Sequence, residues 1–341
     1  MKRVVTLSYH IQHTPTDLYT CCYQIFMMRN LSISNLKRAI KNPTLIKREF
    51  HRLLSVPFHY IYDWYLNNSL SQSIDVMEND WDNLIILDAC RPDFFQQQCD
   101  IQGTFEQKIS PGKRSWEFMT ESFVGREFHD TIYITANPHS QKLPENTFFK
   151  TNYLIDDWND EIGTVLPKDV VSAAKEAHRE HPDKRLIIHF MQPHRPYLGS
   201  TANKLREEVD LIGYRNQGDG LQIWGAVKER KVTQKDTKMA YSETLDIVLE
   251  SVEELLDDID GKTVITSDHG EMLGERVTPF TSRVWGHSEG FNTKILRTIP
   301  WLVINSDQRR GIVEDAPVNG DQKLDQEEVI DRLEALGYTE E

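Results

Sequence analysis

The chain has 341 residues, of which 39% are hydrophobic, and a formal net charge of −14 at pH 7. This length accommodates one large α/β domain with additions, and the composition is that of a soluble globular protein. No apolar run approaches the ~20 residues of a membrane span, and the acidic balance argues against nucleic-acid binding. Residues 1–19 lack the apolar core of a signal peptide, so we expect a cytoplasmic protein.

The N-terminal part, residues 1–78, is predicted to be a basic helical extension that ends in a polar linker. Apolar residues recur at helical spacing between residues 32 and 66, and Lys and Arg occupy the remaining face. A basic amphipathic helix with aromatic residues can bind an anionic membrane surface, so peripheral membrane contact through residues 34–66 is one interpretation. The other interpretation is that the apolar stripe packs on the rest of the chain, which is the commoner fate of an amphipathic helix.

Predicted strands and helices alternate through residues 79–310. Short apolar and β-branched runs predict strands near residues 83–88, 131–136, 185–191, 262–267 and 299–304. Helical periodicity predicts helices near residues 116–125, 168–181, 237–258 and 325–336, the last within an acidic tail at 311–341. This alternation predicts an α/β fold with a doubly wound, mostly parallel sheet flanked by helices. The charged segment 200–235 is predicted to be an insertion near the site, either a substrate lid or decoration.

Three of the predicted strands end in side chains that can bind a metal. Asp88 ends the first run, Asp268 and His269 follow the run at 263–266, and His194 follows the run that begins at residue 185. In open α/β sheets, ligands bind in the crevice beyond the carboxyl ends of the strands. An Asp and a His side by side at such a place can both be ligands of a divalent metal. Gly270 is predicted to provide the sharp exit turn after these ligands. The alternative is an ordinary strand-to-loop turn in which Asp268 and His269 are solvated.

Four segments together resemble the sulfatase-like branch of the alkaline phosphatase superfamily. They are Leu87–Asp93, His189–Tyr197, Ser267–Glu271 and Trp285–Gly290, and their order and wide spacing also match. The resemblance implies a doubly wound α/β fold, a metal-dependent hydrolase or transferase, and a sulfate or phosphate ester as the substrate. It also implies that Asp88, Asp268 and His269 hold one divalent metal ion, which can be Mg, Mn, Ca or Zn.

The resemblance places the nucleophile at the start of a helix one loop after Asp88. Ser115 opens a predicted helix, where the helix dipole favours an anion, although Ser is also a common N-cap. Ser110 is a second candidate, and a shift in alignment would place Lys113 or Arg114 at this position. Three alternatives stay open: Ser115 attacks, a metal-bound water attacks, or activity has been lost. Lys113 and Arg114 have the charge to bind a substrate oxyanion.

Two histidines complete the predicted site. His194 lies between two prolines, and the resemblance implies that it contacts the ester or protonates the leaving group. The alternative is a histidine of an ordinary surface loop. His287 is expected to donate to the substrate oxyanion or to bind a second metal. One metal is the simpler expectation, because the sequence offers no further acidic ligand that we can assign.

Other polar residues of these motifs are expected to lie outside the reacting groups. His189 and Asp93 are predicted to support the ligands from behind, and Glu271 and Glu275 are predicted to face solvent. Cys90 matches part of the sulfatase signature Cys-x-Pro-x-Arg, but the Arg of that signature is not present in the sequence. We therefore interpret Cys90 as a structural residue.

The leading prediction is a metal-dependent hydrolase of sulfate or phosphate esters. A phosphoglycerol or phosphoethanolamine transferase acting on surface glycan or lipid would use the same site and would explain the basic N-terminal helix. A degenerate, non-catalytic member is the third hypothesis, because Lys113 and Arg114 disturb the nucleophile position. Metal content separates the non-catalytic hypothesis from both enzymes.

Overall fold

The computed structural model describes residues 72–209, 211, 222–277, 283–287, 292–318 and 323–336. The chain divides into two compact units, Met1–Pro57 and Phe58–Glu341, and every described residue belongs to the second unit. The basic helices expected at 34–66 therefore lie outside the described residues. Among the described residues, no helix combines the length and the apolar character that crossing a membrane requires.

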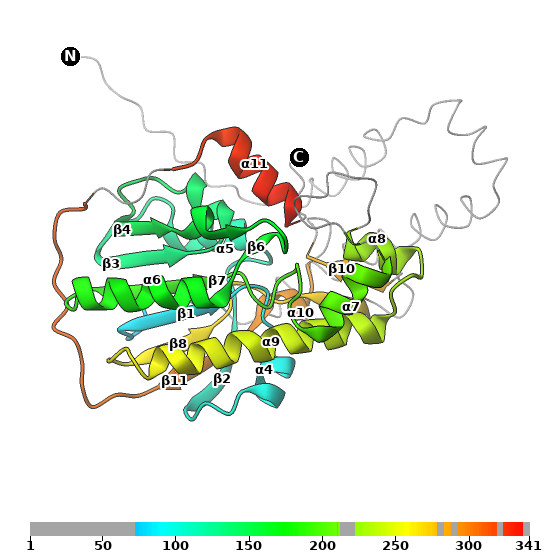
Figure 1. The fold of residues 1–341 in the computed structure, drawn as a ribbon. Coiled ribbons are helices and arrows are strands. Elements are labelled where there is room, and N and C mark those ends of the chain that lie inside the picture. Colours follow the sequence, from blue (N-terminus) through cyan, green and yellow to red (C-terminus); the bar gives the residue numbers. More distant parts are fainter. Residues whose placement is uncertain are drawn as a thin grey trace, which may run out of the picture. The chain divides into compact units, whose positions relative to one another are not determined.

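A seven-stranded sheet forms the centre of the described domain, with the strand order β2-β11-β8-β1-β7-β3-β4 (Figure 1). Strands β8, β1, β7, β3 and β4 run parallel, whereas β11 is antiparallel to both of its neighbours. The strands are β1 Asn83–Leu87, β2 Thr104–Ile109, β3 Phe128–Thr135, β4 Phe148–Tyr153, β7 Arg185–Phe190, β8 Thr263–Thr266 and β11 Thr298–Ile304. The predicted mostly parallel α/β sheet is confirmed.

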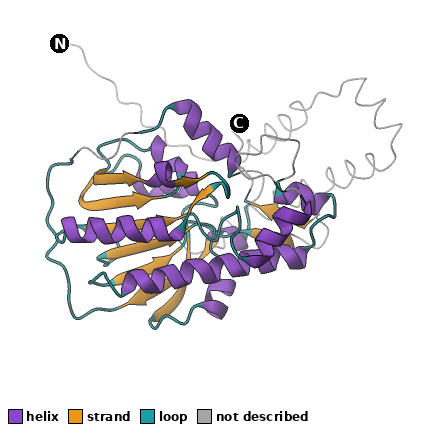
Figure 2. Ribbon diagram, viewed as in Figure 1, coloured by secondary structure: helices purple, strands orange, loops and turns teal. Residues whose placement is uncertain are grey.

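Helices cover both faces of this sheet, because the central strands carry apolar residues on both sides. Ile85 and Leu87 of β1 pack in one core with helices α6 and α9, whereas Leu84 and Ile86 pack in a second core with α5. Helices α6 and α9 run side by side along one face (Figures 1 and 2). The helices of this layer structure are α4 Pro92–Gln98, α5 Ser115–Phe123, α6 Pro167–Glu180, α9 Gln234–Leu256 and α10 Lys294–Arg297. A strand buried on both faces is a continuous apolar run in the sequence, which explains why it can be predicted.

The five predicted strands and the four predicted helices are present within a few residues of their expected bounds. The sequence analysis does not predict β2 and β4, which lie at the two edges of the sheet. Strand β2 is partly exposed and contains Glu106, Gln107 and Lys108, so it has no apolar run to signal it. Helix α4 was not predicted, because we interpreted Pro92 only as the end of the extended run before it. Proline is also well suited to the first turn of a helix, and α4 begins at Pro92.

Smaller elements surround the carboxyl edge of the sheet. The insertion contains helices α7 Ser200–Val209 and α8 Ile223–Lys228, and their apolar residues share a satellite core with Tyr197 and Tyr241. Strands β9 Met272–Arg276 and β10 Arg283–Gly286 pair as an antiparallel sheet, and β5 Trp158–Asn159 pairs with β6 Thr164–Val165. These elements are the ones that border the candidate site described below.

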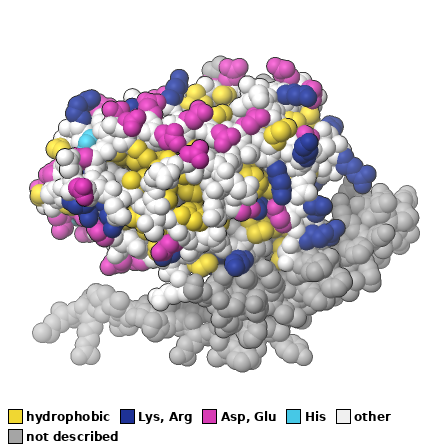
Figure 3. Space-filling view, turned by 90° about the horizontal axis from the view of Figure 1, so that it is seen from below, with side chains coloured by type: hydrophobic (Ala, Val, Ile, Leu, Met, Phe, Trp, Pro, Cys, Tyr) yellow, Lys and Arg dark blue, Asp and Glu magenta, His cyan; other side chains and the backbone are white. Residues whose placement is uncertain are grey.

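Segments on both sides of the predicted core domain pack against it. Val76 and Met77, in the predicted linker, are buried. In the acidic tail, helix α11 Gln326–Ala335 buries Leu333, and the guanidinium of Arg332 lies 4.8 Å from the centre of the Trp158 ring. Asp and Glu side chains are spread over the described surface in Figure 3, with Lys and Arg between them.

Candidate active site and metal centre

The carboxyl ends of neighbouring strands β1 and β8 bring two predicted metal ligands together. Asp88 directly follows β1, Asp268 follows β8 by two residues, and both are fully buried. Ala89 has a left-handed backbone with φ 59°, which is unfavourable for a residue with a Cβ atom. In this conformation its N–H donates to Asp268 Oδ1 at 3.0 Å. The turn after Asp88 therefore ties the two acids to each other.

We call Asp88, Ser115, His189, Asp268 and His269 the strand-end cluster. His269 Nε2 lies 3.7 Å from Asp88 Oδ1 and 3.5 Å from Asp268 Oδ2. His189 Nε2 lies 3.9 Å from Oδ2 of each acid. Ser115 Oγ lies 3.2 Å from Asp88 Oδ2 and 3.3 Å from His269 Nε2. The three predicted metal ligands and the predicted nucleophile thus lie together, and His189, expected behind the ligands, faces them directly.

The atoms at the middle of the strand-end cluster fit a cation. Asp88 Oδ1, Asp268 Oδ2 and His189 Nε2 are buried and have no hydrogen-bond partner among the described residues. The atoms on their far sides are engaged: Asn137 Nδ2 donates to Asp88 Oδ2 at 2.7 Å, and the Tyr133 hydroxyl lies 2.8 Å from His189 Nδ1. Leaving buried polar atoms without a partner is costly. A divalent cation ligated by carboxylate oxygens and imidazole nitrogens would give all three atoms a partner.

The hydrogen bond on the far side of His269 fixes its tautomer. Nδ1 of His269 lies 2.8 Å from the Gly270 carbonyl oxygen, which can only accept a hydrogen bond. The proton is therefore on Nδ1, and Nε2 of the neutral ring carries a lone pair. Metal-binding histidines are commonly oriented by such a bond to a carbonyl oxygen.

Burial sets the protonation of the strand-end cluster. Burial and the neighbouring charge of Asp268 raise the pKa of Asp88 well above its usual range. Burial lowers the pKa of His189 to about 4 and also lowers the pKa of His269. Both imidazoles are therefore neutral near pH 7, which is the form that binds a metal.

Ser115 is held at the start of α5 by a tight loop. It is the first residue of the helix and is fully buried. A Cβ atom on Gly112 would lie 2.3 Å from the Phe118 nitrogen, so only glycine allows the loop to lie this close to the helix. Ser110 donates its hydroxyl to the Asp268 carbonyl oxygen and accepts from Gly112 N–H at 3.1 Å. Ser110 therefore holds the loop, and Ser115 is the serine that faces the predicted ligands.

Lys113 and Arg114 lie just before Ser115 and pair with an acid of the same helix. Arg114 Nε lies 3.2 Å from Glu117 Oε1, and Lys113 Nζ lies 4.0 Å from the same oxygen. The side chain of Arg114 is 27% exposed and that of Lys113 is 20% exposed, so both retain access to solvent. Their role in binding a substrate oxyanion stays a prediction.

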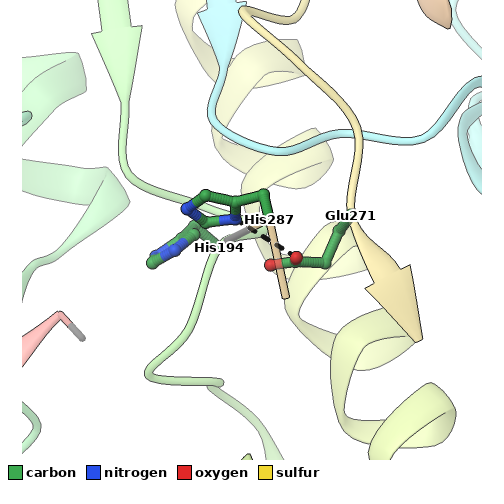
Figure 4. Close-up of side chains that lie close together, drawn as sticks. All are labelled: His194, Glu271 and His287. Atoms are coloured by element: carbon green, nitrogen blue, oxygen red, sulfur yellow. Dashed lines mark hydrogen bonds and ion pairs between the residues drawn. The ribbon is translucent and has the colours of Figure 1, made fainter. Parts of the chain in front are cut away.

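A second group, which we call the outer cluster, consists of His194, Glu271 and His287 (Figure 4). Each contributes a ligand atom, and these atoms lie within 4.8 Å of one another. Glu271 Oε1 lies 3.2 Å from His287 Nδ1. The centre of the His287 ring lies 5.1 Å from that of His194 and 4.5 Å from that of His269. His287 therefore joins the outer cluster to the strand-end cluster.

The prediction that Glu271 faces solvent is wrong, whereas Glu275 is partly exposed. The Glu271 side chain is fully buried, and its Oε2 atom has no hydrogen-bond partner among the described residues. Glu275 is 20% exposed, and its Oε1 atom lies 2.8 Å from Arg91 Nη1. Arg91 also pairs with Asp93 at 2.7 Å and donates to the Glu271 carbonyl oxygen at 3.3 Å, so it holds the backbone beneath the outer cluster. Glu271 is therefore a further buried acid beside the predicted site, which sequence analysis did not find.

Gly270 and Cys90 have structural roles. A Cβ atom on Gly270 would lie 2.0 Å from the Ile295 carbonyl oxygen, so this glycine allows a close approach of two backbones rather than a sharp turn. Cys90 is a buried free thiol, and its N–H donates to Ser267 Oγ at 2.8 Å. This placement supports the structural interpretation of Cys90.

No protein-family model matches the chain, and no curated protein matches it. Several solved structures, however, are similar to the chain. The chain is similar to the zinc complex of the C-terminal periplasmic domain of EcEptC from Escherichia coli, with 16% identity, coverage of 70% of this chain and 76% of that one, and a TM-score of 0.43. It is also similar to the integral membrane lipooligosaccharide phosphoethanolamine transferase A of Neisseria meningitidis, with 14% identity, coverage of 86% and 61%, and a TM-score of 0.40.

A third similar structure is an alkaline phosphatase superfamily protein from Vibrio parahaemolyticus, with 14% identity, coverage of 70% and 61%, and a TM-score of 0.37. This neighbour is described as a member of the superfamily that the sequence motifs of this chain resemble. Because each of these TM-scores is below 0.5, we base the function on the side chains of this chain.

Proposed function

We propose that the chain is a metal-dependent hydrolase of phosphate or sulfate esters in which Ser115 is the nucleophile. The observation that supports this most directly is the position of Ser115 Oγ, within 3.3 Å of both Asp88 Oδ2 and His269 Nε2 at a helix N-terminus. The N-cap of α5 is Arg114, so helix capping does not account for Ser115. The helix dipole favours the negative charge that develops on the serine oxygen.

Asp88, His189, Asp268 and His269 would hold the cation, and two imidazoles among these ligands favour Zn²⁺ over Mg²⁺ or Ca²⁺. When bound, the cation would neutralise the carboxylates and polarise the non-bridging oxygens of the ester. The bonds of Asn137 to Asp88 and of the Gly270 carbonyl to His269 keep these ligands oriented.

In the first half-reaction, Ser115 Oγ attacks the phosphorus or sulfur atom of the ester. A bond forms from Ser115 Oγ to that atom, and the bond from that atom to the alcohol oxygen breaks. Asp88 Oδ2, 3.2 Å from Ser115 Oγ, accepts the serine proton. The 3.2 Å distance puts this carboxylate oxygen within reach of the serine proton, as general-base catalysis requires.

The outer cluster serves the leaving group. His287, oriented by Glu271 at 3.2 Å, gives a proton to the departing alcohol oxygen. Burial lowers the pKa of His194 well below its usual range, and its Nδ1 atom lies 2.6 Å from the Arg195 carbonyl oxygen. His194 is therefore neutral, with its proton on Nδ1, and its Nε2 atom can accept a hydrogen bond from the substrate.

Water completes the cycle. In the second half-reaction the water oxygen bonds to the phosphorus or sulfur atom, and His287 accepts a proton from the water. Ser115 Oγ leaves and regains its proton from Asp88, and inorganic phosphate or sulfate is released. An alcohol acceptor in place of water would make the same seryl ester the intermediate of a transferase.

The test combines elemental analysis with turnover of 4-nitrophenyl phosphate, 4-nitrophenyl sulfate and bis(4-nitrophenyl) phosphate by the full chain. We expect stoichiometric divalent metal and turnover of at least one ester. Ser115→Ala should lower kcat by about 10³-fold or more while keeping the metal. Ser122→Ala is a matched control, because Ser122 is a buried serine on the same helix and should keep wild-type turnover.

Each contrary outcome points to a different correction. An unchanged rate in Ser115→Ala would exclude serine attack and leave direct attack by water. A chain without metal and without turnover of any ester would be a non-catalytic binding protein. Turnover that depends on added glycerol or ethanolamine, with formation of the new ester, would assign a transferase.

A further inference from the structure

A cavity of about 50 Å³ lies where the loop after β7 meets helices α7 and α8. One water molecule needs roughly 10–15 Å³ measured in this way, so the cavity admits a compact group of a few non-hydrogen atoms. Arg195 and Tyr197 line it from the loop, and Leu205 and Arg206 line it from α7. Arg195 directly follows His194 of the outer cluster, so the cavity borders the place where the leaving group is expected.

Two arginines give this cavity positive charge. Arg195 is 9% exposed, and its Nη1 atom donates to Gln222 Oε1 at 3.2 Å. Arg206 donates from Nη1 to Asn203 Oδ1 at 2.8 Å and from Nη2 to the Tyr197 carbonyl oxygen. The acceptors of Arg206 are neutral oxygens, and the charge of Glu161 acts on this guanidinium with no hydrogen bond or ion pair between the two among the described residues. A half-buried guanidinium with neutral partners is suited to bind an anionic ligand.

Tyr197 lines the cavity and carries a buried hydroxyl. The residue is 4% exposed, and its hydroxyl has no hydrogen-bond partner among the described residues. Burial and the charge of nearby Glu271 raise the pKa of this hydroxyl, so it stays protonated. Leu205 and Ile223 provide apolar walls. The cavity therefore combines positive charge with an apolar lining.

We propose that this cavity binds a carboxylate carried by the alcohol part of the substrate ester. The planar carboxylate matches the fork of a guanidinium group and fits the small volume. The substrate class is then a phosphate or sulfate ester of a hydroxy acid whose carbon chain spans the distance from the outer cluster to Arg206. This inference rests on the proposed function, because the ester group itself is bound at the strand-end cluster.

The test uses ω-phosphonocarboxylates of increasing chain length, which are not hydrolysed, and alkylphosphonates of the same lengths as controls. Their Kd values for the metal-loaded full chain are measured by isothermal titration calorimetry, with the ω-sulfonocarboxylates and alkylsulfonates in parallel. We expect one chain length at which the carboxylate lowers Kd by about tenfold, the gain of one charge-assisted contact.

Variants test whether Arg206 causes the lower Kd of the carboxylate ligand. Arg206→Gln should remove the gain and keep the affinity for the alkylphosphonate, and Arg206→Lys should restore only part of it, because lysine lacks the fork. Arg179→Gln is the charge-matched control, since Arg179 is 73% exposed on α6 and should keep the full gain.

The outcomes separate this inference from the proposed function. Equal Kd values for both members of every pair, or a gain that survives in Arg206→Gln, would overturn the carboxylate site while leaving the anion centre in place. Failure of every phosphonate and sulfonate to bind would overturn the anion centre and the carboxylate site together.

Discussion

The strand-end cluster and the outer cluster are neighbours that are built in different ways. In the strand-end cluster, His189 lies within a central strand, and Asp88, Asp268 and His269 follow directly after such strands. The outer cluster takes His194 from a loop. Glu271 directly precedes β9 and His287 directly follows β10, at the same end of this antiparallel pair. A site on the rigid elements of a sheet holds its geometry more exactly than a site on loops.

This difference suggests a division of labour. The strand-end cluster has bonded atoms on its far side, and its remaining atoms converge on one point, as a permanent cation site requires. The outer cluster lies between that point and the basic cavity, where the alcohol part of the substrate would enter. We therefore expect changes in the strand-end cluster to abolish chemistry and changes in the outer cluster to weaken it.

The largest effect is expected for Asp268→Asn. The amide can still accept the N–H groups of Ala89 and His269, which lie 3.0 Å and 2.8 Å from Asp268 Oδ1. It removes the negative charge that a cation requires, so metal content should fall below stoichiometric. Turnover should fall by more than about 10²-fold, the upper end of what loss of a supporting partner costs. Elemental analysis and kcat on the best nitrophenyl ester measure both effects.

Asp82→Asn is the matched control for this variant. Asp82 is equally buried but lies at the other end of β1, where it accepts from Lys262 N–H at 2.7 Å and from Arg309 Nε at 2.6 Å. It should lose stability and keep metal and turnover. Full metal content and full activity in Asp268→Asn would refute the strand-end cluster as the metal centre.

The contrast between the clusters also explains how much of the site could be predicted. Asp88, Asp268 and His269 follow apolar runs that end abruptly, and such runs are the clearest signal of buried parallel strands. His189 could have been found by alternation, because it lies on the same face of β7 as Ile187 and thus faces α5, which begins at Ser115. The sequence pattern alone did not distinguish this position from a support behind the ligands.

Glu271 shows where prediction from sequence stops. No apolar alternation surrounds it, and an acid that follows a glycine in a loop is usually exposed. Its burial depends on contacts made by distant segments, such as the bond from Arg91 to its carbonyl oxygen and the position of His287. The edge strands β2 and β4 were missed for a related reason. They carry several polar residues, so their sequences alone do not indicate strands, and only pairing with the neighbouring strand shows that they belong to the sheet.

A smaller effect is expected for Glu271→Gln. The change replaces the carboxylate oxygen that orients His287 at 3.2 Å, so turnover should fall by about 10- to 100-fold. The metal of the strand-end cluster should stay, because Glu271 is not among its ligands. Loss should be greatest for esters with poor leaving groups, which depend most on protonation. The measurement is kcat for a series of aryl esters whose alcohols differ in pKa.

Glu275→Gln controls for the loss of an acid from the same β9-β10 sheet. Glu275 pairs with Arg91 and Lys238 at 2.8 Å and 3.2 Å and lies outside the cluster, so this variant should keep wild-type turnover. If Glu271→Gln lost all metal and all activity, the division of labour between the two clusters would be wrong.

The smallest effect concerns stability and isolates one histidine of the strand-end cluster. Burial lowers the pKa of His189 from its ordinary 6.5 to about 4. Between these values the unfolded chain binds a proton that the folded chain does not bind, so the free energy of unfolding falls as the pH falls. In metal-free protein His189 should contribute a loss of at most about 3 kcal/mol between pH 6.5 and pH 4.

Urea denaturation of the chelator-treated chain at several pH values tests this contribution. Other buried histidines act in the same direction, because burial also lowers the pKa of His194 and His269. The informative quantity is therefore the difference between the wild type and His189→Gln, which keeps a polar side chain but does not titrate. The variant should lose less stability than the wild type over this range. Equal slopes would mean that His189 is already solvated or protonated in the folded chain, and the packing assigned to the strand-end cluster would then be wrong.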